Sequence, residues 1–275
     1  MNKTIYTQWR DFFFHPFFII LATPLTYLLI GTIYAAQIVK LSLLPFFMLY
    51  LFILLNQFLE KMVANWLQKP EKVLSFILLV SEMINLLVII YFISSLNSLI
   101  GLLLVLYSLL IQGHSYLIKI GLDWFSIVMQ AIFKGGILTY LSFSIQLSFI
   151  PNTLFLWSIP LIVLALLIEL GNYQVKLEQI TALAEKTIVS VRNLHILFIG
   201  LLVFLYLSSF FILWPAFGYI TLFLLLSMPM AVKVMRSFQP VKKEEMRRSS
   251  RLKQLSAYSI FFLLIFAAII STRFF

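Results

Sequence analysis

The sequence predicts an all-α polytopic membrane protein with a single transmembrane domain over residues 1–275. Three observations predict this class: 62% of the residues are hydrophobic, only 11% are charged, and the mean hydropathy is +1.04. Soluble domains carry about half apolar and about a quarter charged residues. A water-soluble globule is therefore excluded, and the apolar segments leave too few residues for a separate soluble domain.

Each expected span is an apolar segment close to the length of about 20 residues that a helix needs to cross a bilayer. We expect nine transmembrane helices, at Phe17 to Ala36, Leu41 to Phe58, Val73 to Ile93, Leu99 to Ile118, Trp124 to Ser144, Thr153 to Leu170, Ile196 to Leu213, Gly218 to Met235 and Leu255 to Ile270. The first segment lacks a small-residue cleavage site, so we expect a retained span and not a signal peptide.

The basic residues predict the orientation. If the N-terminus is cytoplasmic, 17 Lys and Arg residues fall on that side, two (Lys40 and Arg273) fall on the other, and Lys134 lies within a span. Cytoplasmic loops are enriched in Lys and Arg, so we expect the C-terminus outside and the chain in a bacterial cytoplasmic (inner) membrane. The net charge of +10 is then explained by the Lys and Arg residues of the cytoplasmic loops and does not indicate a nucleic-acid partner.

Three of the predicted inward loops are long: residues 60–72, 173–192 and 236–253. We therefore expect the function on the cytoplasmic face, and we expect the last loop to bind anionic lipids through its basic residues. The chain has no cysteine, which excludes disulfides and thiolate metal sites.

Ionisable residues within the predicted spans are candidate functional groups, because a charge is costly in hydrocarbon. Glu82 and Lys134 lie about 14 to 15 Å deep at 1.5 Å per residue. Two interpretations stay open for them: a structural ion pair, or groups along a substrate cavity. Glu169 and His114 lie near cytoplasmic helix ends, where His114 is a packing residue or a general base.

Two motifs close inward-running helices: Asn56-Gln57-Phe58-Leu59-Glu60 ends the second, and Asn172-Tyr173-Gln174-Val175-Lys176 follows the sixth. Glu185-Lys186-Thr187-Ile188 comes later, and a stretch from His114 through Tyr116 and Lys119 to Asp123 joins the fourth and fifth spans. With nine spans, this pattern resembles the UbiA superfamily of intramembrane prenyltransferases, whose members carry aspartate-rich motifs after helices two and six.

The resemblance implies a UbiA-like bundle that transfers the prenyl chain of an isoprenoid diphosphate to an aromatic or lipid acceptor. It implies the following roles: catalytic Asn56, Glu60 and Asn172; diphosphate-binding Tyr116, Lys119, Lys176 and Lys186; cavity-lining Glu82, His114, Lys134 and Glu169; and Mg²⁺ held by Glu60 and Glu178.

The sequence departs from the family pattern at five of its six aspartate positions. Gln57, Ala64, Tyr173, Lys176 and Ile180 carry no acid there, and only Glu60 does. A loss of about 4 kcal/mol of transition-state stabilisation slows a reaction roughly a thousandfold, so we expect impaired magnesium dependence.

Two further functions remain open from the sequence. One is a non-catalytic family member that binds an isoprenoid, quinone or pigment as a membrane subunit or assembly factor, which the missing acids favour. The other is a small transporter that uses Glu82, Lys134 and Glu169 as a charge relay. No repeated broken-helix pattern supports the transporter, and we rank it last.

Overall fold

A computed structural model of the chain describes residues 15–147, 149–184, 188–239 and 248–272. Within these residues every regular element is helical. Eight helices are long and apolar enough to cross a membrane. The chain is therefore an integral, multi-pass membrane protein, as the composition predicts.

The elements follow one another with short connections. In chain order they are α2 (Pro16–Ala36), α3 (Leu43–Gln68), α4 (Lys72–Ser95), α5 (Ser98–Lys119), α6 (Asp123–Ala131), the π-helix η1 (Ile132–Ile137), α7 (Leu138–Ser144), α8 (Asn152–Ala184), α9 (Ile188–Phe217), the 3₁₀ helix η2 (Gly218–Ser227), α10 (Met228–Ser237) and α11 (Arg248–Ser271).

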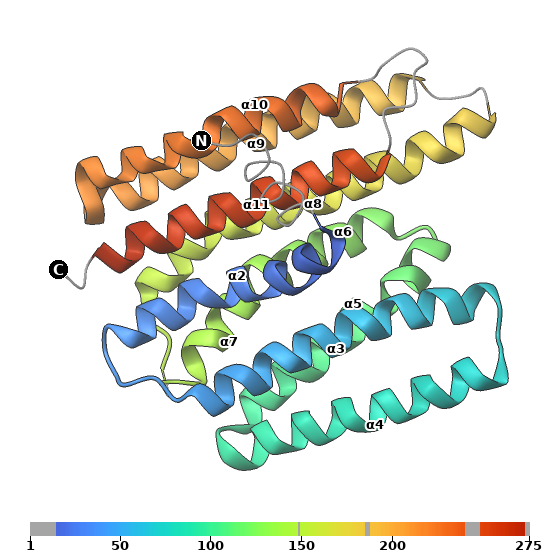
Figure 1. Cartoon of the computed structure of the whole chain (residues 1–275), viewed down its shortest axis with the longest axis horizontal. Helices are drawn as coiled ribbons and strands as arrows, with labels where there is room; N and C mark the ends of the chain where they lie inside the picture. Colours follow the sequence, from blue (N-terminus) through green and yellow to red (C-terminus); the bar gives the residue numbers. More distant parts are fainter. Residues whose placement is uncertain (1–14, 148, 185–187, 240–247, 273–275) are drawn as a thin grey trace, which may run out of the picture.

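The long helices lie side by side in one bundle (Figure 1). Helices α3, α4 and α5 pack together at one side, and α9, α10 and α11 lie at the other. Between them, α8 packs against α6, η1, α9 and α11, while α2 packs against α7 and α11. Helix α4 exposes large apolar side chains such as Val73, Phe76 and Leu87, which suits a surface that faces lipid.

The predicted long inward loops are wrong in length, because the helices continue through them. Helix α3 extends to Gln68, α8 extends to Ala184, and α11 already begins at Arg248. Polar residues at these positions end the hydrophobic segment but do not end the helix, since Glu, Gln, Lys and Arg are good helix formers. The function expected of loop residues 60–68 and 173–184 therefore belongs to helix ends.

The seventh and eighth predicted segments belong to one helical run of 46 residues, Arg192–Ser237. The run reverses direction near Gly218, whose φ of +53° is in the left-handed region that favours glycine. After this turn η2 packs back against α9, and α10 lies alongside α9 (Figure 1).

Glycines allow two pairs of helices to approach closely in the centre of the bundle. A Cβ on Gly31 of α2 would overlap Thr139 and Ser142 of α7, and a Cβ on Gly135 of η1 would overlap the α8 backbone at Leu161. Small residues at helix contacts are the usual means of close packing in membranes. The Gly31 contact brings α2 against α7, and the Gly135 contact brings η1 against α8.

We predict that Gly135→Ala destabilises the protein by about 1 to 3 kcal/mol, because the new methyl group meets backbone that cannot rotate away. Gly200→Ala is the matched control, since a Cβ on Gly200 meets no atom within 4 Å. The control should be neutral or stabilising, because alanine is the better helix former. Thermal unfolding in detergent measures both, and equal midpoints would contradict the packing argument.

Candidate functional site

The central candidate site is a group of four polar residues, Glu60, Gln130, Lys134 and Glu169, which we call the Lys134 group. Lys134 Nζ donates hydrogen bonds to Glu169 Oε1 at 2.7 Å and to Gln130 Oε1 at 2.5 Å. The Lys134 and Glu169 side chains are 20% and 8% exposed. This pair is a buried ion pair between η1 and α8.

The backbone around Lys134 departs from the regular α-helix. Residues Ile132–Ile137 form a π-helix between α6 and α7, and short π-helical turns occur frequently at functional sites. Gly135 directly follows Lys134 and brings η1 against α8, the helix that carries Glu169. The close helix contact thus holds the ammonium beside its carboxylate partner.

Glu60 of α3 completes the group from the other side of the bundle. It interacts with the Gln130 side chain and lies within electrostatic range of both Lys134 and Glu169. Gln130 Nε2 is buried without a hydrogen bond of normal geometry. Side chains from the second and sixth predicted spans therefore approach the same ammonium group.

His114 lies at the edge of the Lys134 group. Its Nδ1 is 2.6 Å from Ser126 Oγ, and it lies within electrostatic range of Lys134, Glu169 and Lys176. Three of the four predicted cavity residues, His114, Lys134 and Glu169, are thus brought together.

The fourth predicted cavity residue, Glu82, belongs to a separate amide network on α3, α4 and α5. Asn85 Nδ2 donates to Glu82 Oε2 at 3.2 Å and to Ser108 Oγ at 2.7 Å. Asn56 Nδ2 donates to Asn85 Oδ1 at 3.0 Å, and Gln112 Nε2 donates to Asn56 Oδ1 at 3.2 Å. Lys134 therefore pairs with Glu169 and not with Glu82, because η1 packs on α8 whereas α4 packs on α3 and α5.

Asn56 belongs to the amide network and precedes Glu60 by one helical turn on α3. Asn56 is fully buried, whereas Asn172, its predicted counterpart on α8, is exposed. The two asparagines are thus not equivalent in this bundle. The buried one is held by amide partners, and the exposed one lies at the surface.

Three of the four predicted diphosphate-binding residues lie on the surface of the described part of the chain. Lys119 and Lys176 are exposed, Tyr116 is 56% exposed, and Lys186 lies outside the described residues. Lys176 lies within electrostatic range of His114. The rings of Trp124 and Tyr173 are 6.1 Å apart. These contacts place the end of α5, the start of α6 and this part of α8 at one end of the bundle.

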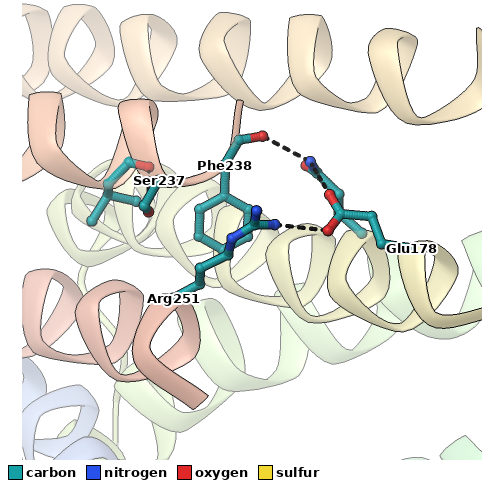
Figure 2. A network of polar contacts seen from close by, with 6 residues as sticks. Glu178, Ser237, Phe238 and Arg251 are labelled. Carbon is teal, nitrogen blue, oxygen red and sulfur yellow. Dashed lines mark hydrogen bonds and ion pairs between the residues drawn. The ribbon is translucent and has the colours of Figure 1, made fainter. Parts of the chain in front are cut away.

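A second, partly buried ion pair, which the sequence did not predict, joins α8 to α11 (Figure 2). Arg251 Nη1 donates to Glu178 Oε2 at 2.7 Å. Gln174 Nε2 donates to Glu178 Oε1 at 3.2 Å and to the Phe238 carbonyl at 2.9 Å. Arg251 was expected in a lipid-binding loop, but it is 6% exposed on a helix. The sequence did contain one sign of a polar contact here: Gln174 and Glu178 are four residues apart and therefore lie on the same face of a helix.

Glu178 therefore has a structural partner, in contrast to its predicted role as a magnesium ligand beside Glu60. Among the described residues no three His, Asp or Glu side chains form a group suited to a metal ion. Mg²⁺ requires octahedral oxygen ligands. A divalent ion about 4 Å from the Lys134 ammonium would also be repelled by about 8 kcal/mol at an effective dielectric constant of about 20. The residues present do not fit the implied magnesium.

The chemistry open to the Lys134 group is hydrogen bonding and charge stabilisation within a low-dielectric interior, where both are stronger than in water. Its members are held by helices and not by loops, so their positions are well defined. Comparison of the chain with protein-family models, with curated proteins and with solved structures finds no match.

We predict that Lys134→Met and Glu169→Gln each lower the free energy of unfolding by about 3 to 5 kcal/mol, because each leaves a buried charge without its partner. The double variant should be more stable than the sum of the two losses implies. A double-mutant cycle on thermal or denaturant unfolding in detergent measures this coupling. Additive losses would show that the two side chains act independently.

We predict that Arg251→Met destabilises the α8–α11 contact by about 1 to 3 kcal/mol, because Glu178 loses a charged donor and Arg251 leaves its buried position. Lys253→Met, two residues along the same helix and partly exposed, is the control and should change stability by less than about 0.5 kcal/mol. Unfolding midpoints that move equally in both variants would remove the structural role of the pair.

Proposed function

We propose that this chain is a divergent UbiA-type membrane protein that binds an isoprenoid diphosphate and transfers its prenyl chain to an aromatic or lipid acceptor. The observation that carries the proposal is the approach of Glu60, from α3, and Glu169, from α8, to one ammonium group. The resemblance places the reacting head group between these two helices. A polar group at this junction supports that arrangement.

The exposed lysines support the binding of the diphosphate. Lys176 lies within electrostatic range of His114, which borders the Lys134 group. Lys119 is the last residue of α5, the helix that carries His114. Charge-assisted hydrogen bonds from lysine to phosphate oxygens are stronger than neutral ones. These lysines would hold the diphosphate at the membrane surface while the isoprenoid chain lies among the apolar helices.

The second candidate is a non-catalytic protein that binds an isoprenoid, quinone or pigment. It is favoured by one observation: Lys134 already neutralises Glu169, so the carboxylates are not free to assemble a metal centre. In this function the bundle holds the lipid intact, and the protein serves as a membrane subunit or an assembly factor.

The proposal also includes the number of membrane crossings and the sides on which the two termini lie. Nine crossings follow if α9 and the η2–α10 segment each cross the membrane separately. The distribution of basic residues supports a cytoplasmic N-terminus and an external C-terminus, in a bacterial cytoplasmic membrane.

Native mass spectrometry of the detergent-purified protein with farnesyl diphosphate, with and without Mg²⁺, separates the two candidates. A bound farnesyl diphosphate that is cleaved supports the transferase. An intact prenyl diphosphate or a co-purified quinone or pigment supports the binding protein. A protein that retains no isoprenoid species at all contradicts both.

We predict that Lys119→Ala/Lys176→Ala weakens the binding of farnesyl diphosphate at least about tenfold, a loss of about 1.4 kcal/mol, because two cations that face the diphosphate are removed. Lys40→Ala/Lys233→Ala removes two exposed lysines elsewhere and is the charge-matched control. Equilibrium binding of radiolabelled farnesyl diphosphate measures both variants. Equal affinity in the wild type and the first variant would exclude these two lysines as the diphosphate site.

A further inference from the structure

We infer that Lys134 is a built-in cation that occupies the position of a divalent metal ion between Glu60 and Glu169. The inference rests on the proposed function, because the resemblance implies a Mg²⁺ ion at Glu60. The second ligand that it implies, Glu178, is paired with Arg251, and the carboxylate near Glu60 is that of Glu169. The inference adds that the site of this chain works without a metal ion.

Two carboxylates from different helices can both stay ionised inside a membrane only if a positive charge lies beside them. Glu169 is buried and Glu60 is half-buried, and each lies within electrostatic range of the other. Lys134 supplies that charge at 2.7 Å from Glu169. A lysine carries its charge on the polypeptide, so this cation cannot dissociate.

The position of the ammonium is held from several sides. Gln130 accepts its second hydrogen bond, and Gly135 packs η1 against the backbone of α8. Further charged or polar neighbours of the group include Lys61, which acts on Glu60, and His114 at the edge of the group. The buried Tyr27 and Tyr107 lie within electrostatic range of Glu169.

An ammonium has three N–H donors, and Lys134 uses two of them for Gln130 and Glu169. The third can be given to an oxygen atom of a bound head group. Lys134 can thus neutralise the carboxylates and contact a ligand at the same time, as a metal ion would, but without open sites for water.

Binding of Mn²⁺ to the purified full-length protein tests the inference. Mn²⁺ is a probe for Mg²⁺ sites, because it also prefers oxygen ligands. Electron paramagnetic resonance should detect no Mn²⁺ bound to the wild type at this site. Lys134→Met should acquire at least about tenfold higher affinity, because it leaves two carboxylates without a cation. The added substitution Glu169→Gln should remove the gain, and Lys40→Met, at an exposed lysine, should behave as the wild type.

Thermal unfolding provides a second readout of the same inference, because a ligand that binds only the folded state raises its stability. Mn²⁺ should raise the unfolding midpoint of Lys134→Met and should leave that of the wild type unchanged. This measurement also covers the case in which Lys134→Met folds poorly without metal, since Mn²⁺ then restores it.

Two results would overturn the inference. One is a stoichiometric Mn²⁺ ion on the wild type that Glu169→Gln releases. The other is a Lys134→Met variant whose Mn²⁺ affinity and unfolding midpoint in Mn²⁺ equal those of the wild type. Neither result depends on whether farnesyl diphosphate binds, so failure of this inference is distinguishable from failure of the proposed function.

Discussion

The ion pair between Lys134 and Glu169 is the interaction on which the centre of this bundle depends. Charges inside a membrane are costly unless they are paired, and this pair is 2.7 Å long and largely removed from the surface. It forms only if η1 lies directly against α8, which the missing side chain of Gly135 permits. The packing of η1 on α8 and the neutralisation of Glu169 by Lys134 are therefore one constraint, because the ion pair needs the close helix contact.

The same constraint organises the polar residues around it. Glu60 and Asn56 lie one turn apart on α3, so this helix joins the Lys134 group to the amide network of Asn85. The amide network and the Lys134 group thus both include side chains of α3. The Arg251–Glu178 pair fulfils a different task. It joins α8 to α11. Gln174 of α8 also donates to the carbonyl of Phe238, the residue that follows the last residue of α10.

These contacts change what the UbiA resemblance implies for this chain. The family pattern calls for acids that collect a metal ion, but here Glu178 pairs with an arginine and Glu169 with a lysine. A bound anion would meet fixed cations of the protein in place of a metal. The two candidate functions differ in whether such a site also supports bond cleavage, since fixed ammonium groups stabilise charge but do not provide the ligand exchange of a metal ion.

The sequence by itself determined the class of protein and most of the helices. Hydrophobic segments of membrane-spanning length are a local property, so α2 was predicted to within one residue and α4 and α5 to within two at each end. The helical extensions of α3, α8 and α11 were missed, because hydropathy marks where lipid ends and not where a helix ends. Only the tertiary structure decided which charges are partners. Glu82 and Lys134 lie at similar depth, but depth carries no information about which helix faces which. The choice of Glu169 for Lys134 and of Glu178 for Arg251 follows from helix packing, a non-local property that no single segment encodes.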